Sequence, residues 1–363
     1  MVRRNSPLRT CIMKLLICTQ AVDTTDPVLG FFHDWVAEFA KHCDEVVVIC
    51  LREGEHNLPK NVRVLSLGKE RTANHAQTGR SRARIAYLRR FYRYVWRERR
   101  NYDAVFVHMN QEYVLLGGLL WNAWGKRVYM WRNHSAGSLG TDIAALLCKN
   151  IFCTSKHSYT AKYRKTILMP VGIDTDVFNA DNTQRRAPHS ILFLSRMAPV
   201  KRPDILLGAL AELNHKGISF AASFYGDPTY SDRPYYESLK QKSAGSDLNE
   251  QVFFKLGIPN RQTPAVYRAH ELFVNCSPSG LYDKTIFEAA ACGCLALAAS
   301  RDYADVADPR LVFDGTASGL AAAIEKLITL PQGEQELLRK RGEELAKQQS
   351  LKALAEKLFS LNI

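Results

Sequence analysis

The hydrophobic residues of this chain fall into short runs, separated by longer segments in which they recur at helical spacing. In the first half, the runs predict strands at residues 14–19, 45–50, 62–67, 104–109, 127–131, 151–154 and 167–170. Between the first two, Phe31, Trp35 and Phe39 lie four residues apart and predict a helix over residues 30–42. Strands that alternate with helices in this way are typical of parallel α/β architecture.

The pattern begins again after a polar stretch without period at residues 179–189, which we interpret as a linker. Beyond it, strands are predicted at residues 191–195, 220–225, 252–255, 271–275 and 295–299. The sequence therefore predicts an α/β protein with two doubly wound, Rossmann-like domains at residues 13–178 and 190–348, and a cleft between them. In sheets of this kind, ligands bind beyond the carboxyl ends of the strands.

The first residues look like a signal peptide, because arginines precede an apolar stretch. Lys14 interrupts that stretch, however, and Gln20 and Asp23 stand where a cleavage site needs small residues. We expect a strand that begins near Met13, with residues 1–12 as a loose extension. No apolar run approaches the ~18 residues of a membrane span.

The nine cysteines form no C-x-x-C pair, so we expect reduced core cysteines in a cytoplasmic protein.

Positive charge is concentrated in the first half of the chain. Residues 1–180 hold 27 Lys and Arg against 15 Asp and Glu, net +12, whereas residues 181–363 hold 22 against 21, net +1. The segment Arg80–Arg100 contains nine arginines and one glutamate, with apolar residues at helical spacing between them. It predicts a core-packed helix whose basic face is either solvated or attracted to an anionic membrane surface. We expect no nucleic acid there, because no nucleic-acid-binding motif accompanies the charge.

Two cations follow the first predicted strand of the second half. Arg196 and Lys201 lie five residues apart in a loop that leads from strand to helix, at the carboxyl edge of the sheet. Fixed cations and a helix N-terminus at this place would stabilise the negative charge that develops on a departing nucleoside diphosphate. The alternative is that both are ordinary solvated loop residues.

A second segment, from Ser277 to Cys294, places a glycine-bearing loop and a short alanine-rich helix after another strand. We expect this helix to open near Lys284 and to end before Gly293. It carries Glu288, a carboxylate that is costly to bury unless it accepts hydrogen bonds. The two hydroxyls of a ribose would donate such bonds. A cap on the loop or a pair with Lys284 is the alternative.

Arg196 with Lys201, followed by S-P-S-G-L-Y-D-K-T-I-F-E-A-A-A-C-G from Ser277, resembles the retaining glycosyltransferases of family 4, the glycosyl transferases group 1, which have the GT-B fold. The segments P-V-G-I-D from Pro170 and F-Y-G-D around Gly226 also resemble motifs of that family. The match covers most of the second half of the chain, with the motifs in the family's order.

This resemblance implies roles for the residues that carry it. Arg196 and Lys201 would hold the diphosphate of the donor, near Gly226, and Glu288 would bind the ribose. The reaction would need no metal and no cofactor besides the substrate, a nucleotide-diphosphate sugar. A helix at residues 349–363 would cross back to the first domain.

The chain departs from the family in the donor loop. Gly280 stands where the family typically has the first of two glutamates, which contacts the donor sugar. Asp283, three residues later, could reach the sugar instead, with Lys284 beside the phosphates. In addition, Val171 replaces the usual asparagine before Gly172. These changes bear on the identity of the donor more than on the fold.

The first half offers candidates for the opposite wall of the cleft. His108 resembles the second histidine of the family's H-x-H strand, which lies near the reacting anomeric centre. It would donate a hydrogen bond to the donor sugar, or it is a satisfied core histidine. The other candidates for the acceptor site or the cleft are Asp23, Asp26, Gly30, Asn110 and His134. For the two aspartates, a purely structural turn is an equal alternative.

The function expected from the resemblance is transfer of a sugar from a nucleotide-diphosphate sugar to an acceptor hydroxyl, with retention of anomeric configuration. The acceptor would be a saccharide or a lipid-linked saccharide at the inner face of the membrane, in cell-surface glycan, lipopolysaccharide or glycolipid synthesis. One alternative is a sugar-nucleotide epimerase of the same fold, which would need further acidic and histidine groups in the cleft. The other is a non-catalytic protein that binds a sugar nucleotide or a membrane, because Gly280 lacks the first carboxylate.

Overall fold

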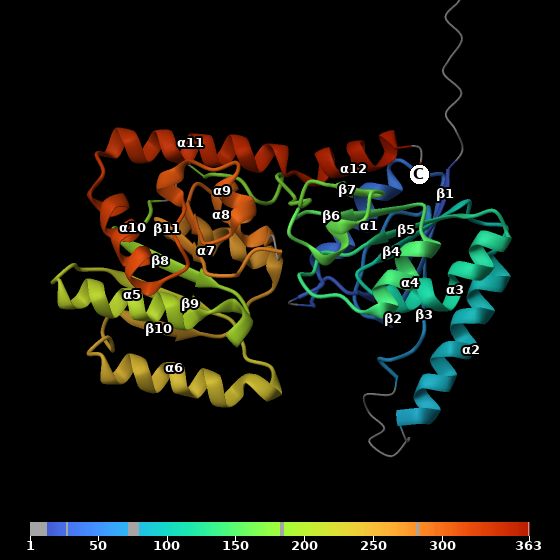
Figure 1. Ribbon diagram of the computed structural model, residues 1–363, viewed down its shortest axis with the longest axis horizontal. Coiled ribbons are helices and arrows are strands. Elements are labelled where there is room, and N and C mark those ends of the chain that lie inside the picture. The colour runs from blue at the N-terminus through green and yellow to red at the C-terminus, as the bar shows by residue number, and fades with distance from the viewer. Residues whose placement is uncertain (1–12, 27, 72–79, 182–184, 281–282, 362) are drawn as a thin grey trace, which may run out of the picture.

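Two α/β domains lie side by side in the computed structural model (Figure 1), which describes residues 13–26, 28–71, 80–181, 185–280, 283–361 and 363. The first domain has a sheet of seven strands in the order β3-β2-β1-β4-β5-β6-β7, and the second has five in the order β10-β9-β8-β11-β12. Every strand pair is parallel. The predicted α/β class with two doubly wound domains is confirmed.

The first domain contains seven strands and four long helices among its described residues. Its strands are β1 (Lys14–Val22), β2 (Glu45–Glu53), β3 (Val62–Ser66), β4 (Ala104–His108), β5 (Arg127–Trp131), β6 (Asn150–Cys153) and β7 (Thr166–Leu168). Its helices are α1 (Phe31–Ala40), α2 (Arg80–Glu98), α3 (Gln111–Ala123) and α4 (Leu139–Leu147).

The second domain follows the same alternation. Its strands are β8 (Ser190–Leu194), β9 (Ala221–Tyr225), β10 (Val252–Lys255), β11 (Leu272–Asn275) and β12 (Leu295–Ala298). Its helices are α5 (Pro203–His215), α6 (Arg233–Gly245), α7 (Thr263–Ala269), α8 (Lys284–Ala291), α9 (Arg301–Ala304), α10 (Ala317–Thr329) and α11 (Gln332–Gln348).

Both faces of the first sheet are covered, because alternate residues of each strand point to opposite sides. Leu15 and Ile17 of β1 pack with α1 on one face, whereas Leu16 and Cys18 pack with α2, α3 and α4 on the other. A last helix, α12 (Leu351–Ser360), also packs on the α1 face, and its Leu354 is fully buried there. The segment before α12 runs beside the segment that follows β7 and forms a bridge between Ile173 and Ser350.

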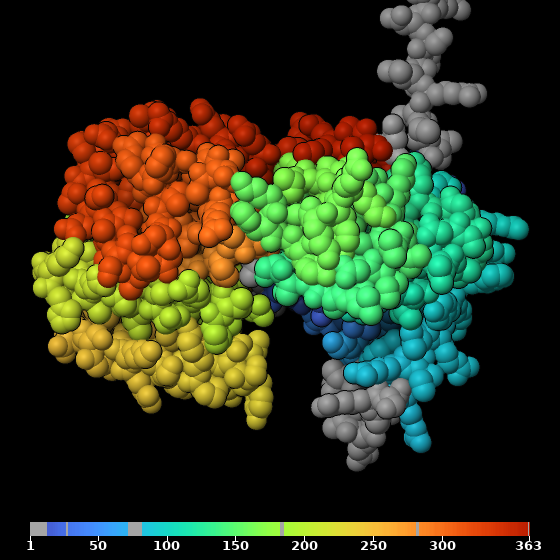
Figure 2. Space-filling model, in the orientation of Figure 1, coloured from blue at the N-terminus to red at the C-terminus, as the bar shows by residue number. Residues whose placement is uncertain are grey.

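The surface is hollowed where the two domains face each other (Figure 2). The loops that follow β6 and β11 meet beside this hollow, so the carboxyl edges of both sheets contribute to it. The eight cysteines within the described residues are buried and free. Within the described part of the chain, every helix is too short or too polar to span a bilayer.

Candidate active site

The loop after β8, which carries Arg196, is held by a close approach to the loop after β9. Gly226 has φ +147°, and a Cβ at this position would lie 1.9 Å from the carbonyl oxygen of Ser195. Only glycine fits so close to another backbone segment. The Ser195 N–H donates to the Tyr225 carbonyl at 3.1 Å. Arg196 leaves this packed loop as an exposed side chain at the carboxyl edge of the second sheet.

Lys201 lies in the same loop, just before α5, and is paired with Asp283. Its ammonium donates to both carboxylate oxygens of Asp283, at 2.8 and 2.7 Å. One of these oxygens also accepts from the Ser277 hydroxyl at 2.6 Å and from the Asn275 amide at 3.0 Å. Burial alone would raise the pKa of Asp283, but the charge of Lys201 and these bonds hold it below the ordinary value. We call these four residues the Lys201 network.

Gly280, in the predicted donor loop, contacts the first domain. Its φ is +89°, and a Cβ there would lie 2.9 Å from the His157 carbonyl oxygen and 2.9 Å from Cβ of Ser135. The Ser158 hydroxyl donates to the Gly280 carbonyl at 3.5 Å. In this arrangement of the domains, the first domain therefore occupies the space that a glutamate side chain would need at this position.

Asp302, near the start of α9, accepts hydrogen bonds from both sides of this contact. Its carboxylate accepts from the Ser155 hydroxyl at 2.6 Å and from the backbone N–H of Lys156 at 3.2 Å, both in the first domain. It also accepts from the N–H of Gly280 at 3.5 Å. An ion pair between Lys156 and Asp305, at 2.5 Å, adds a second link. The donor loop is thus positioned partly by the first domain.

Lys284, the first residue of α8, bridges the two domains. Its ammonium donates to the Gly172 carbonyl at 2.8 Å and lies 3.8 Å from the ring centroid of Phe31 and 4.5 Å from that of Trp35. The Trp35 indole N–H donates to the same carbonyl at 2.9 Å. Burial lowers the pKa of Lys284, and nearby carboxylates, Glu288 first among them, oppose this shift. Two aromatic rings and a carbonyl hold the cation in place.

Glu288, four residues further along α8, is 3% exposed. Its carboxylate accepts from the Tyr267 hydroxyl and from the Asn260 amide, both at 3.3 Å. Burial raises its pKa, although the charge of Lys284 acts in the opposite direction. Two protein groups thus donate the hydrogen bonds that a buried carboxylate needs. Binding of a ribose by Glu288 stays a prediction.

His108 ends β4 in an aromatic environment. Its ring stacks on Phe32 with the centroids 3.8 Å apart, and its Nδ1 lies 3.3 Å from the Thr19 hydroxyl. Burial and the positive charge of Lys284 lower its pKa to about 3, so the imidazole is neutral at physiological pH. The next residue, Met109, has φ +64°, a strained conformation for a non-glycine residue. It turns the chain toward Asn110, which precedes α3.

The remaining first-domain candidates form local turns. Asp23 accepts hydrogen bonds from the backbone and the hydroxyl of Thr25. Asp26 accepts from the N–H groups two and three residues further on, both at 2.8 Å. A Cβ at Gly30 would lie 2.6 Å from the Asp26 carbonyl oxygen, which explains the glycine. His134 is exposed and accepts from the Ala136 N–H at 2.9 Å. Binding of an acceptor by these residues stays a prediction.

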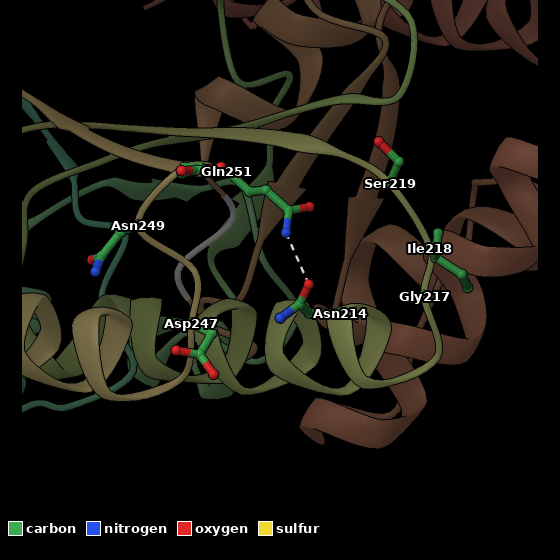
Figure 3. Close-up of a pocket in the computed structure, with 8 residues that line it drawn as sticks. Asn214, Gly217, Ile218, Ser219, Asp247, Asn249 and Gln251 are labelled. Carbon is green, nitrogen blue, oxygen red and sulfur yellow. Dashed lines mark hydrogen bonds between the residues drawn. The ribbon is translucent and has the colours of Figure 1, made fainter.

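A separate pocket lies at the opposite, amino edge of the second sheet (Figure 3). Polar loop residues line it, and the Gln251 amide donates to Asn214 at 2.8 Å. It carries none of the predicted site residues. Across the residues that the structure describes, no group of three or more His, Cys, Asp or Glu side chains is placed to hold a metal ion.

Two parallel-sheet α/β domains that face each other have the architecture of the GT-B proteins. Residues 175–348 match the family described as "Glycosyl transferases group 1". Over 96% of its length, the chain superimposes on the Anabaena protein HepE in complex with UDP (TM-score 0.74, 17% identity, 99% of that chain). Sucrose-phosphate synthase from Thermosynechococcus elongatus gives a TM-score of 0.75 at 16% identity, over 96% of this chain and 98% of that one. These likenesses confirm the GT-B fold.

Curated relatives match a shorter segment. The GDP-mannose-dependent alpha-(1-6)-phosphatidylinositol monomannoside mannosyltransferase of Mycolicibacterium smegmatis is 29% identical over 163 residues, 40% of each chain. The D-inositol 3-phosphate glycosyltransferase 1 of Catenulispora acidiphila is 30% identical over 141 residues, 36% of this chain and 34% of its own. The match thus spans about two fifths or less of the relatives' length.

Several residues that shape the site were not predicted from the sequence. Asn275 ends β11 and Ser277 lies two residues beyond it, so the rule that ligands lie beyond the carboxyl ends of parallel strands could have found them. Nothing in the sequence pattern pointed to Asp302, or to Phe31 and Trp35 as partners of Lys284, because these contacts join the two domains.

Proposed function

We propose that this protein is a glycosyltransferase that moves a sugar from a nucleotide-diphosphate sugar to an acceptor hydroxyl, with retention of anomeric configuration. The observation that carries the proposal is the Lys201 network, which fixes a half-buried ammonium at the carboxyl edge of the second sheet, within a segment that matches the glycosyl transferases group 1. A buried carboxylate, Glu288, lies on the helix that begins beside this network.

In the proposed mechanism, the departing nucleoside diphosphate gains negative charge as its bond to the sugar breaks. The ammonium of Lys201 and the exposed guanidinium of Arg196 stabilise that charge, and no metal ion is needed. The neutral imidazole of His108 donates one hydrogen bond to the sugar from the first domain. When Nδ1 accepts from the Thr19 hydroxyl, the imidazole proton is on Nε2, which is then the donor to the sugar. The leaving phosphate takes the proton of the acceptor hydroxyl, which attacks from the same face.

The proposed acceptor is a saccharide or a lipid-linked saccharide at the inner face of the membrane. Two observations support it. One relative is named for a phosphatidylinositol mannoside, and the first half of this chain carries a net charge of +12, from 27 Lys and Arg against 15 Asp and Glu. The basic helix α2, within the segment Arg80–Arg100, is the part we propose to meet the anionic membrane surface.

A panel of UDP-, GDP- and ADP-sugars tests this function. We expect one donor to be consumed, with release of its nucleotide and with the product's anomeric configuration, measured by NMR, equal to that of the donor. Tight binding of a donor without turnover would instead favour a sugar-nucleotide-binding protein. A nucleotide sugar with an inverted ring carbon as the product would favour the epimerase.

A further inference from the structure

Three neighbouring helices of the first domain present large apolar side chains to solvent. They are α2, α3 and α4, which cover the sheet face opposite α1. The side chains are Ile85, Leu88, Tyr92 and Trp96 of α2, Leu115 and Leu119 of α3, and Leu139, Ile143 and Leu146 of α4. These nine make up more than half of the seventeen exposed large hydrophobic side chains in the described residues. We call them the apolar face.

The three helices are packed together, so the apolar face lies on adjoining elements. The Tyr92 hydroxyl of α2 donates to the Leu116 carbonyl of α3 at 3.1 Å. Between α3 and α4, the Asn122 amide donates to the Leu147 carbonyl at 3.0 Å. Gly118 allows this approach, since a Cβ there would lie 2.9 Å from the Leu147 side chain.

Helix α2 has two apolar stripes, where a helix on the surface of a globular domain usually has one. Phe91 and Val95 of the inner stripe are buried in the core. The outer stripe, at residues 85, 88, 92 and 96, keeps a spacing of three or four residues and remains exposed; Trp96 is 57% exposed. Packing within the first domain explains the inner stripe. In the outer stripe, Tyr92 bonds to Leu116 and Trp96 packs against Trp124, but both side chains remain exposed.

Exposed arginines border the outer stripe. They are Arg82, Arg84, Arg89, Arg93, Arg97 and Arg100. The one acidic residue of α2, Glu98, is buried and accepts from Arg97 and Arg63, so among the six arginines it neutralises Arg97. An apolar stripe bordered by arginines is the composition of a helix that lies in a membrane interface.

We propose that the apolar face docks on an anionic phospholipid bilayer, with Trp96, Leu119 and Leu146 entering the interface and the α2 arginines binding the headgroups. A patch of this extent on one side of a domain marks an interaction site. A second copy of the chain fits it poorly, because an isologous contact would place like-charged arginines against each other. A nucleic acid would use the arginines but leave the leucines exposed to water.

This proposal deepens the proposed function, on which it rests, by naming the surface that brings the enzyme to its acceptor. Helix α2 follows β3, so its Arg80 end lies at the carboxyl edge of the first sheet. In Figure 1 that end extends toward the side on which the hollow between the domains opens in Figure 2. A bilayer against the apolar face would therefore lie beside the mouth of the cleft, within reach of a lipid-linked acceptor.

Binding of the full chain to vesicles tests the proposal. Flotation with phosphatidylcholine vesicles that contain phosphatidylglycerol is compared with flotation using phosphatidylcholine alone. A variant with Trp96→Ser, Leu119→Ser and Leu146→Ser removes apolar groups, and one with Arg84→Gln, Arg89→Gln and Arg93→Gln removes charge. We expect each to lower partitioning onto anionic vesicles by about tenfold or more. Lipids brominated on their acyl chains should quench tryptophan fluorescence more strongly in the wild type than in Trp96→Ser.

Matched controls come from the second domain. Leu256→Ser removes a side chain that is 78% exposed, and Lys326→Gln with Lys340→Gln removes two exposed cations; neither should change vesicle binding. Loss of binding in the arginine variant alone, equal binding to neutral vesicles, or self-association that the serine variant abolishes would each overturn the proposal. Donor consumption measured without vesicles should be unchanged in all variants. If the wild type binds vesicles but consumes no donor, the proposed function fails while the docking surface stands.

Discussion

Individual side chains determine how well the site can stabilise charge on a substrate. Lys201 is held by a carboxylate that is itself fixed by a hydroxyl and an amide. Such a group does not have to reorganise when charge develops in the transition state. Asp283, which the sequence offered as a substitute sugar ligand, faces this lysine in the structure. It is therefore a positioning residue for Lys201 as well as a candidate ligand.

Removal of the ammonium should slow catalysis strongly. We expect Lys201→Ala to lower kcat by about 10²-fold or more, as for loss of a transition-state charge contact. Asp283→Asn should lower kcat less, because the lysine remains but loses its fixed position, and Asp283→Glu should recover part of the loss. Lys216→Ala, which removes an exposed lysine of the same domain, is the control. Near-normal turnover of Lys201→Ala would remove this residue from the site.

His108 should contribute to acid sensitivity. Its pKa is lowered from 6.5 to about 3 in the folded protein, so the unfolded chain binds a proton more readily. The stability that follows is present above about pH 6.5 and is lost as the pH falls toward 3. Thermal unfolding of His108→Gln between these pH values should therefore show a weaker decline than that of the wild type. Parallel declines would show that the histidine is accessible to protons in the native state.

At the scale of elements, the buried strands were predictable and the contacts between elements were not. The runs at 127–131 and 252–255 coincide with β5 and β10. β5 is almost entirely buried, as its apolar sequence predicts, whereas β10 is an edge strand whose Phe253 is exposed. β1 continues to Val22 past the predicted end at residue 19, because Gln20 is an exposed polar residue within the strand. The start of α8 at Lys284 was also predicted. The partners of Glu288 lie on other elements, and no spacing in the sequence reveals them.

The two loops at the carboxyl edge of the second sheet should depend on Gly226. A Cβ 1.9 Å from the Ser195 carbonyl oxygen forces the loop of Arg196 and Lys201 to move. We expect Gly226→Ala to weaken donor binding, measured by calorimetry, and to lower the midpoint of thermal unfolding. Gly217→Ala, at a glycine that also has positive φ but open space around it, should affect stability without changing donor affinity. Equal effects on donor affinity would contradict this interpretation.

The whole molecule is held together by contacts around the hollow. Asp302 links two loops of different domains, Lys284 inserts between aromatic rings, and an ion pair at 2.6 Å joins Arg261 to Asp34. These contacts explain why the sequence, with its separate motifs in each half, predicted the domains but not their arrangement. Gly280 is an example, because its contact with the first domain leaves no space for a side chain at this position.

Loss of the Asp302 contact should loosen the domains. We expect Asp302→Ala to increase the radius of gyration in small-angle scattering without donor and to raise the donor KM more than it lowers kcat. Asp305→Ala removes a more exposed ion pair next to it and should have a smaller effect. An unchanged radius together with unchanged KM would show that Asp302 does not set the arrangement of the domains.

Metal dependence is likewise a property of the whole enzyme. If the cations of the second domain stabilise the leaving group, a chelator should leave donor consumption intact. Activity before and after EDTA treatment, with Mg²⁺ added back, measures this. Abolition by EDTA with recovery on Mg²⁺ would contradict the proposed mechanism.

The position of α12 has a consequence for how the protein is made. Leu354, Ala355 and Leu358 complete a hydrophobic face of the domain whose strands leave the ribosome first. That face stays open to water until residues 351–360 have been synthesised and have folded back. The first domain therefore cannot complete its core until α12 has been synthesised. A nascent chain arrested before residue 351 should be a substrate for chaperones.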